Sequence, residues 1–472
     1  MRVGLICPDS PFLLDSRVFP TLGVLQVAAS LLANHHEVGV LDLSGVPNPI
    51  SALESFLSPG YDCIGITGTS PQLPAVMQIF QNIKMLDSSV RVIIGGPHAT
   101  VDPSSLLMFD SVVMGDGEEA ILTAIQKDSP KIIDQASNVV KGILPYHRPA
   151  RQLIDMSSYE YSLAGIKGTS ALSSSGCPYN CGFCCGRSSP FYRRVRTRDL
   201  SDLRNEMIEL QEIYGINAVM FFDDELSLDD KYTLQLCSTL APLGMKFRGF
   251  VKANLFTSEQ AEAFAKAGFV ELCTGVEAAH QRILDVMEKK TTPAINKRFV
   301  DLCRQNGIRS KCFTSIGHPS ESEETVFALR DWLIETRPDE FDITVISVYP
   351  SSPYWDNSVD TGESIDGKKV RKYVKKSRNL TENGATLFFE EVDYTREFSF
   401  YKGKPGEYTS HVWTPELSKQ DLVRLRDQTE DQVRSALSLS YPKRHSGDNF
   451  EGSMGMGASP QNTHKLLKVL ES

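Results

Sequence analysis

Short apolar segments alternate with helical patterns along most of this 472-residue chain, and this alternation restricts the fold more than any other feature. An apolar run of strand length followed by helical periodicity is typical of βα units, whose strands form parallel sheets. The alternation comes in two series. A stretch with Pro145, Pro149 and few periodic apolar positions, residues 144–167, separates them. We therefore predict an α/β protein with two parallel sheets.

The first series has five apolar runs of the buried-strand type and two clear helical patterns, Leu22–Leu32 and Pro74–Leu86. It predicts a doubly wound, Rossmann-like sheet, in which ligands bind outside the carboxyl ends of the strands. Glycines in the loops at those ends let backbone N–H groups approach a ligand, although such loops also suit tight turns. The predicted strands are Val3–Cys7, Glu37–Leu43, Cys63–Gly68, Val90–Ile94 and Ser111–Met114.

The second series has six apolar runs, and its clearest helix is Asp199–Tyr214. Six βα units fall short of the eight that close a full barrel, so we expect a partial (β/α)6 TIM-like barrel. The predicted strands are Thr169–Ser173, Ala218–Phe222, Lys246–Lys252, Val270–Gly275, Arg309–Ile316 and Thr344–Val348.

The rhythm stops near residue 356, where we expect a small mixed C-terminal segment. Leu380–Glu390 and Phe398–Trp413 are rich in aromatic and acidic residues, and Lys419–Leu437 reads as a helix. Residues 447–460, with glycine and methionine alternating, suggest a flexible tail. The expected domain limits are 1–148 for the Rossmann-like domain, 149–167 for a linker, 168–356 for the partial barrel and 357–472 for the C-terminal segment.

Composition limits the surroundings and the partners of the protein. No run of 18 apolar residues and no secretory signal is present, so we expect a cytoplasmic protein without a membrane span. The net charge of −10 argues against a nucleic-acid backbone as the main partner. Ten cysteines without an export signal should be reduced thiols or metal ligands.

Three cysteines carry the chemistry. Cys177, Cys181 and Cys184 lie at spacing C-x3-C-x2-C in a loop rich in Gly, Pro and Asn, directly after the first strand of the second series. Three thiolates around a [4Fe–4S] cluster would leave one iron without a protein ligand, open to a substrate or cofactor. Two alternatives need a fourth ligand: zinc, with Cys185 or His318, and a conventional electron-transfer cluster, with Cys185.

The segment Cys177-x3-Cys181-x-Phe183-Cys184 resembles the cluster motif of the radical S-adenosylmethionine (radical SAM) superfamily. The resemblance implies a partial barrel with this loop after its first strand. It also implies that the open iron binds the amino and carboxylate groups of SAM. An electron from the cluster then splits SAM into methionine and a 5′-deoxyadenosyl radical. Phe183 would pack beside the adenine.

Further segments resemble SAM-binding positions of this family: Phe221-Phe-Asp-Asp-Glu225, Gly275-Val-Glu277 and Gly317-His-Pro-Ser-Glu321. Barrel active sites gather side chains from the carboxyl ends of strands, and a zwitterionic sulfonium needs carboxylates together with a cation or an amide. Helix capping, turns and surface positions are the plainer roles for these residues. The predicted SAM-binding set is Phe183, Asp223, Asp224, Lys252, Asn254, Glu277 and His318.

The first 148 residues resemble the cobalamin-binding domain of one radical SAM subgroup, through residues 19–23, 65–71, 95–100 and 115–118. No Asp-x-His-x-x-Gly motif occurs, so a histidine below the cobalt is not indicated, and His98 after Gly-Gly-Pro is more simply a loop residue. The candidate cobalamin contacts are Thr69, Ser70, Gly95, Gly96, His98, Gly115, Gly117 and Glu118.

Two reactions follow from the resemblance. With cobalamin, the enzyme would methylate an unactivated carbon of a small metabolite in natural-product metabolism. Without it, the enzyme would dehydrate or deoxygenate a hydroxylated or amino sugar. Either needs a flavodoxin- or ferredoxin-type electron donor. The basic run of residues 192–198 could bind the SAM carboxylate or guide an acidic donor, and it equally suits a solvated face.

Overall fold

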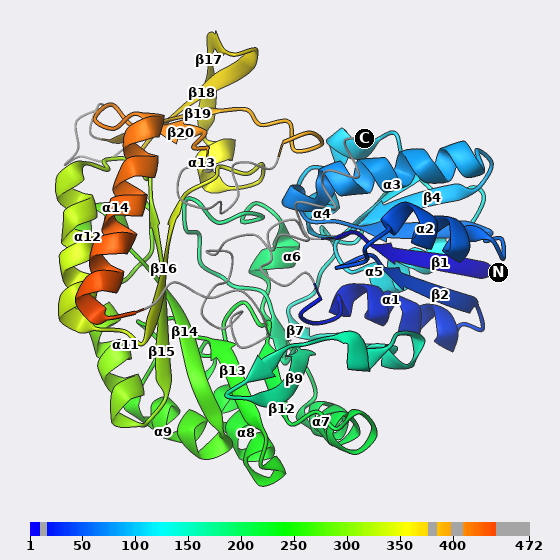
Figure 1. Cartoon of the computed structure of the whole chain (residues 1–472), viewed down its shortest axis with the longest axis horizontal. Coiled ribbons are helices and arrows are strands. Elements are labelled where there is room, and N and C mark those ends of the chain that lie inside the picture. The colour runs from blue at the N-terminus through cyan, green and yellow to red at the C-terminus, as the bar shows by residue number, and fades with distance from the viewer. Residues whose placement is uncertain (10–16, 376–384, 398–408, 440–472) are drawn as a thin grey trace.

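The computed structural model describes residues 1–9, 17–375, 385–397 and 409–439 (Figure 1). Its N-terminal part is a six-stranded parallel sheet in the order β2-β1-β3-β4-β5-β6. Helices α1 and α5 pack on one face of the sheet, and α2 and α3 pack on the other. The strands are β1 (Arg2–Cys7), β2 (Glu37–Asp42), β3 (Cys63–Thr67), β4 (Arg91–Gly95), β5 (Ser111–Met114) and β6 (Ile132–Asp134). The helices are α1 (Leu22–Ala33), α2 (Pro49–Leu57), α3 (Leu73–Leu86), α4 (Pro97–Val101) and α5 (Gly117–Ala124).

The predicted Rossmann-like class is confirmed. The strand order reverses between β1 and β3, which makes the carboxyl ends of these strands the expected ligand crevice. Strand β6 and helix α2 were not predicted. Strand β6 has only three residues, of which two are exposed, so it lacks the apolar run of a central strand.

The second part is a curved sheet in the order β16-β15-β14-β13-β12-β9-β8. Six of its strands are parallel, as the partial (β/α)6 barrel requires, and β8 (Ser162–Leu163) forms an antiparallel hairpin with β9. The parallel strands are β9 (Ile166–Ala171), β12 (Ala218–Phe221), β13 (Lys246–Phe250), β14 (Phe269–Glu277), β15 (Arg309–Ile316) and β16 (Glu340–Val345). The outer helices are α7 (Leu200–Tyr214), α8 (Asp230–Leu240), α9 (Ser258–Ala267), α10 (Gln281–Val286), α11 (Pro293–Gln305) and α12 (Glu323–Thr336).

Two predicted strands of the barrel were displaced. Strand β9 begins three residues earlier than expected, and β16 begins four residues earlier. The start of β16 carries two buried acidic residues that broke the apolar pattern. Both have distant basic partners: Glu340 pairs with Arg434 at 3.1 Å, and Asp342 pairs with Lys311 at 3.2 Å.

The C-terminal part is a four-stranded antiparallel sheet with helix α14 (Lys419–Leu437), which packs beside α12 and has the bounds that the sequence predicts. The strands are β17 (Ser358–Ile365), β18 (Lys368–Val374), β19 (Thr386–Glu390) and β20 (Val412–Trp413). A short helix, α13 (Pro353–Asp356), leads into this sheet. The stretch 447–460 lies outside the described residues, as does most of the segment 398–413.

The strands β7 (Gly142–Ile143), β10 (Ser174–Ser175) and β11 (Arg196–Thr197) form a small sheet. Strand β7 and the short helix α6 (Pro190–Arg193) lie between the two main parts (Figure 1). The chain between them is not loosely attached. Arg151 and Tyr161, both in the expected linker, are almost completely buried.

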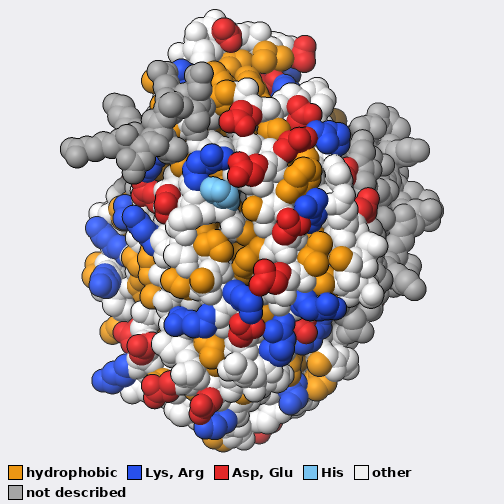
Figure 2. Space-filling view, turned by 90° about the vertical axis from the view of Figure 1, so that its left-hand side faces the viewer, with side chains coloured by type: hydrophobic (Ala, Val, Ile, Leu, Met, Phe, Trp, Pro, Cys, Tyr) orange, Lys and Arg blue, Asp and Glu red, His pale blue; other side chains and the backbone are white. Residues whose placement is uncertain are grey.

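The outer helical face of the barrel carries basic and acidic side chains with small groups of hydrophobic ones between them (Figure 2). Across the described ranges, no helix combines the length and the apolar character that a membrane crossing requires.

Candidate functional site

The loop with the three cysteines runs from β10 to α6 at the carboxyl ends of the barrel strands. Two glycines fix its path. Gly176 has φ +93°, and a Cβ there would lie 2.2 Å from the carbonyl oxygen of Arg194. A Cβ on Gly182 would lie 2.1 Å from the ring of Tyr354. Because neither position has room for a side chain, the loop is held tightly against its neighbours.

Gly182 also anchors the loop through its backbone. Its N–H donates to the carbonyl of Met287 at 2.8 Å, and its carbonyl accepts from the N–H of Tyr354 at 2.9 Å. The N–H of Cys177 donates to the carbonyl of Tyr192 at 2.9 Å. The loop is therefore tied to three separate segments: the end of α10, the start of α13 and α6.

Three cations surround the loop, and two of them, Arg187 and Lys252, are buried. Arg187 donates through Nη1 to the carbonyl of Cys177 at 2.8 Å, and its Nε is buried without a hydrogen-bond partner. Lys252 and Lys289 also lie within electrostatic reach of the thiol of Cys181. Burial raises the pKa of Cys177, and it raises the pKa of Cys184 to about 11. These thiols lose their protons when they bind a metal, and the three cations then balance the negative charge.

Both candidate fourth ligands have contacts of their own in this structure. The Cys185 thiol contacts the carbonyl of Pro350 at 3.7 Å, and the thiols of Cys181 and Cys184 make similar contacts with backbone carbonyls. The ring of His318 bonds the hydroxyl of Ser315 through Nε2 at 2.9 Å and that of Tyr354 through Nδ1 at 3.2 Å. Among the described residues, no three His, Cys, Asp or Glu side chains are gathered at single-ion distances. The donor set of three thiols and buried cations fits an iron–sulfur cluster, which spreads its ligands more widely than one ion does.

Asp223, one of the predicted SAM-binding residues, contacts the start of the cysteine loop. Its carboxylate accepts the N–H of Ser173 at 2.9 Å, the N–H of Ser174, and both hydroxyls at 2.6 and 2.7 Å. Burial raises the pKa of Asp223 to about 6, although these hydrogen bonds oppose the shift. With its oxygens occupied in this way, Asp223 positions the loop.

The neighbouring acids differ from Asp223 and from each other. Asp224 is exposed, and its carboxylate accepts the N–H of Gly176 at 2.7 Å. Glu225 is buried and accepts the N–H of Ser227 at 2.8 Å, and burial raises the pKa of Glu225 to about 7. Glu225 was not among the predicted site residues, although it stands in the same strand-end segment.

Lys252 and Asn254 lie close to the cysteine loop. The ammonium of Lys252 lies 4.3 Å from the centre of the Tyr179 ring and donates to the carbonyl of Lys289 at 2.7 Å. Burial and the charge of Lys289 lower the pKa of Lys252. Asn254 has a buried Oδ1 without a hydrogen-bond partner. A buried acceptor left free in this way suits the ammonium group of a bound ligand.

Glu277 stands at the end of β14 with φ +61°. Its carboxylate accepts Lys289 Nζ at 2.8 Å and the Ser315 hydroxyl at 2.8 Å. Burial opposes ionisation, yet Lys289 lowers the pKa of Glu277. The chain of contacts continues from Ser315 to His318, whose ring meets Phe183 edge to face at 5.3 Å. The structure thus brings Glu277, His318 and Phe183 together, and it places Lys289, which was not among the predicted site residues, at the centre of this group.

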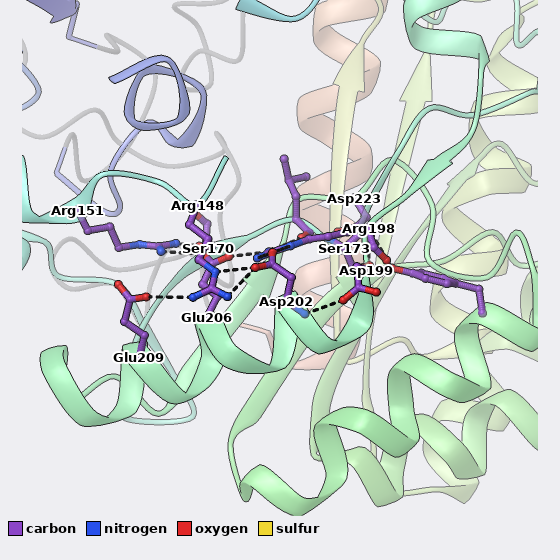
Figure 3. Close-up of polar contacts among 12 residues, drawn as sticks. Arg148, Arg151, Ser170, Ser173, Arg198, Asp199, Asp202, Glu206, Glu209 and Asp223 are labelled. Carbon is purple, nitrogen blue, oxygen red and sulfur yellow. Dashed lines mark hydrogen bonds and ion pairs between the residues drawn. The ribbon is translucent and has the colours of Figure 1, made fainter. Parts of the chain in front are cut away.

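An ionic network joins Arg148, Arg151 and Arg198 to acidic residues of α7 (Figure 3). Glu206 on α7 pairs with Arg151 and with Arg198, each at 2.6 Å, and all three side chains are 1% exposed. Arg198 also pairs with Asp202 at 2.5 Å, and Arg148 joins Asp202 at 2.6 Å. The network ties the linker to α7.

The same arginines reach the carbonyls that lead into the cysteine loop. Arg151 donates to the carbonyl of Ser170 at 3.2 Å, and Arg198 donates to that of Leu172 at 3.3 Å. The Tyr232 hydroxyl donates to the carbonyl of Ser173 at 2.7 Å. The end of β9 is therefore fixed before the loop begins.

A cavity of about 460 Å³ lies at the carboxyl edge of the N-terminal sheet. One wall consists of the glycine loops of that sheet and the start of α1. The other wall comes from the barrel: Leu172, Ser175, Phe191, Tyr192, Arg196 and Phe222. Three of these, Phe191, Tyr192 and Arg196, directly follow the cysteine loop, so the two parts of the chain share one cavity.

Five of the eight candidate cobalamin contacts line this cavity: Gly95, Gly96, Gly115, Gly117 and Glu118. Thr69, Ser70 and His98 are not part of its wall. The ring of His98 is buried and bonds Ser70 Oγ at 2.8 Å and Ser105 Oγ at 3.1 Å. His98 therefore holds its own loop, as the simpler interpretation of the sequence had it.

An ion pair crosses the cavity. Arg196 of the barrel contacts the carboxylate of Asp116 between the two glycines of the β5 loop, and the Nε of Arg196 is buried without a hydrogen-bond partner. Burial raises the pKa of nearby Glu118 to about 7. At Gly23, a Cβ would meet no atom within 4 Å. The wall thus offers free polar groups and open space, which fits a bulky polar cofactor.

Family models match both parts of the chain. Residues 172–333 match the radical SAM superfamily, and residues 16–125 match the B12 binding domain. The chain thus contains a radical SAM domain preceded by a B12-binding domain. The cofactors that a radical SAM domain implies are a [4Fe–4S] cluster and SAM.

Two relatives illustrate how far the likeness of this radical SAM protein extends. An uncharacterized methyltransferase of Pyrococcus horikoshii is 24% identical over 386 residues, which cover 76% of this chain and 83% of the relative. The bacteriochlorophyllide d C-12(1)-methyltransferase of Chlorobaculum tepidum is 25% identical over 416 residues, which cover 82% and 86%.

Among solved structures, the radical SAM methyltransferase TsrM of Kitasatospora setae, with tryptophan and a SAM analog bound, matches with a TM-score of 0.68. The identity is 16%, and the match covers 100% of this chain and 99% of TsrM. This likeness supports the fold of the radical SAM protein described above.

Proposed function

We propose that this protein is a cobalamin-dependent radical SAM methyltransferase that acts on an unactivated carbon of a small metabolite. The observation that carries the proposal is the shared cavity: a cofactor held by the glycine loops of the N-terminal sheet would face residues that directly follow the cysteine loop. Two relatives that are described as methyltransferases, and that match this chain over most of their length, support the same reaction class.

The residues of the cysteine loop have the chemistry for the cluster. Cys177, Cys181 and Cys184 would hold it, and when bound with SAM it supplies a 5′-deoxyadenosyl radical that abstracts hydrogen. Arg187 and Lys289 would offset the charge of the thiolates in a buried setting, where unpaired charge is costly.

The surrounding side chains suit the polar groups of SAM. The free Oδ1 of Asn254 would accept a hydrogen bond from the ammonium. Lys252 would attract the carboxylate, and Phe183, fixed by the ring of His318, would offer its face to the adenine. Glu277 orients Lys289 and Ser315 and thereby holds this arrangement.

The cavity wall suits cobalamin. Its apolar lining would pack against the macrocycle, while the Nε of Arg196 and the carboxyl of Glu118 offer hydrogen bonds. Because burial raises its pKa to about 7, Glu118 is partly protonated at neutral pH and can donate as well as accept. None of the residues that line the described wall is a histidine, so the wall itself offers no imidazole group to the cofactor.

Two finer points belong to the proposal. The enzyme would receive its electrons from a flavodoxin- or ferredoxin-type protein. It would work in the cytoplasm, which its ten free cysteines support.

Corrinoid retention tests the proposal. Purified with hydroxocobalamin, the protein is expected to keep about one corrinoid per chain, measured by its visible spectrum. Gly23→Phe, which adds a ring where the cavity is open, should abolish retention, whereas Gly23→Ala should preserve it. A wild-type protein without corrinoid would contradict methylation and favour cobalamin-free dehydration of a sugar.

A further inference from the structure

A strip of exposed basic and apolar side chains borders the cysteine loop. It consists of Val140, Lys141, Ile143, Arg193 and Arg194. Val140 is 76% exposed and Ile143 is 81% exposed, which is unusual for large apolar side chains, and the three basic side chains are exposed as well. We call this surface the basic strip.

The basic strip is joined directly to the loop that carries the cysteines. Arg193 donates through Nη2 to the carbonyl of Pro178 at 3.4 Å, one residue after Cys177. The carbonyl of Tyr192, the residue before Arg193, accepts the N–H of Cys177 at 2.9 Å. The other residues of the strip, Val140, Lys141 and Ile143, lie on or next to β7. Strand β7 is held beside Arg193 and Arg194 because it pairs with β11, and the N–H of Gly142 donates to the carbonyl of Val195 at 3.2 Å. One residue of the strip, Arg193, therefore contacts the residue next to a predicted cluster ligand.

The charge of the strip stands out in an acidic chain. The whole protein has a net charge of −10. In the same basic run, Arg196 and Arg198 are buried in ion pairs with Asp116 and Glu206. Within the described part of the chain, neither Arg193 nor Arg194 pairs with a carboxylate, and Arg194 reaches only the carbonyl of Val139. The run thus divides into a structural half and an exposed half.

We propose that the basic strip is the docking surface for an acidic one-electron-donor protein. Exposed cations beside an apolar patch steer an acidic partner and hold it briefly, and electron-transfer encounters need only small contact areas. The reduced flavin or iron–sulfur group of the donor loses one electron, and the cluster held by Cys177 gains it. This inference rests on the proposed function, because it requires a cluster that must be reduced.

The test compares two reductants. A purified bacterial flavodoxin with its NADPH-dependent reductase needs docking, whereas dithionite, a small molecule, does not. In Lys141→Glu/Arg194→Glu, SAM cleavage driven by flavodoxin should fall at least about tenfold at low salt. Its rate should also lose most of the salt dependence that the wild type shows between about 0.05 and about 0.3 M salt. Cleavage driven by dithionite should stay unchanged.

Matched variants separate docking from general effects. Lys127→Glu/Lys266→Glu makes the same charge change at exposed positions after α5 and on α9, away from the strip, and should leave both rates near the wild type. Val140→Ser/Ile143→Ser should raise the KM for flavodoxin without changing the rate with dithionite. Equal losses with both reductants, equal losses in the remote variant, or a change of oligomeric state in the strip variants would overturn the proposal. Failure of the wild type with dithionite would count against the proposed function instead.

Discussion

The carboxylate of Asp223 accepts both the backbone N–H and the side-chain hydroxyl of Ser174, which opens the cysteine loop. A residue at the end of the second barrel strand therefore fixes the start of the loop that follows the first strand. The same carboxylate also accepts from Ser173, so that two consecutive residues are held by one side chain. The geometry of the cluster ligands thus depends on a residue that does not contact them.

Removing this carboxylate should loosen the cluster loop. Asp223→Ala leaves two buried backbone N–H groups without acceptors, which should cost about 3 kcal/mol of unfolding free energy. We expect the iron content of Asp223→Ala after anaerobic reconstitution to be far below that of the wild type. Asp223→Asn keeps one acceptor oxygen, so its iron content should lie between those of the wild type and Asp223→Ala. Wild-type iron content and stability in Asp223→Ala would show that the loop does not need this clamp.

The buried network of Figure 3 should be sensitive to its central acid. Glu206→Gln removes the one negative charge that Arg151 and Arg198 share in the interior, which should lower stability by about 3–5 kcal/mol in urea denaturation. Glu209→Gln, on the same helix, is the matched control. Its carboxylate is 34% exposed and lies 3.8 Å from Arg148, so a change below about 1 kcal/mol is expected. Equal effects of the two substitutions would argue against a structural role of the network.

The contact between Gly182 and Tyr354 predicts an intolerant position. In Gly182→Ala, the new Cβ would lie 2.1 Å from the buried ring of Tyr354, so the loop or the ring must move. We expect loss of most cluster-derived absorbance near 400 nm after reconstitution, while the far-ultraviolet circular dichroism stays close to that of the wild type. A Gly182→Ala protein with a full cluster would mean that the loop is not set by this contact.

His98 gives a prediction that depends on pH. Burial lowers the pKa of His98 to about 4, and the charge of Asp102 partly opposes this shift. In the unfolded chain, the pKa of the same side chain is about 6.5. The unfolded state therefore binds the proton more readily, and stability should fall as pH drops from about 6.5 toward about 4, by at most about 3 kcal/mol. Denaturation of the wild type and of His98→Gln across this pH range measures how much unfolding free energy each protein loses. The loss should be smaller in His98→Gln than in the wild type.

The same variant addresses cobalt ligation. Because both ring nitrogens bond serine hydroxyls and the ring is not part of the cavity wall, His98→Gln should retain corrinoid with an unchanged visible spectrum. A spectral shift in this variant would assign a ligand role to His98 after all.

The sequence predicted the features that depend on local patterns. The six barrel strands and α14 follow from apolar periodicity, and the cysteine loop follows from its spacing and its place after a strand. The start of β16 was missed because Glu340 and Asp342 are buried there with partners that are distant in sequence. Local periodicity carries no signal of such pairs.

The roles of single side chains were harder to predict. The position of Asp223 at a strand end was visible, but its use by Ser173 and Ser174 depends on the spacing of β9 and β12 in the sheet. Lys289 was missed because it follows a short helix rather than a strand, and only the fold brings it to Glu277. The basic run after the cysteines could not be divided into Arg196 and Arg198, which are buried, and Arg193 and Arg194, which are exposed, without the structure.

The most direct measurement asks whether three thiols leave one iron open to SAM. The anaerobically reconstituted protein, reduced with dithionite and mixed with SAM labelled with ¹⁵N in its amino group and ¹⁷O in its carboxylate, is studied by electron–nuclear double resonance. We expect about four irons per chain and hyperfine coupling to both labels, with cluster and coupling lost in Cys181→Ala. A reduced cluster of full occupancy without coupling to either label would contradict the account, because the cluster would then have no iron that binds SAM.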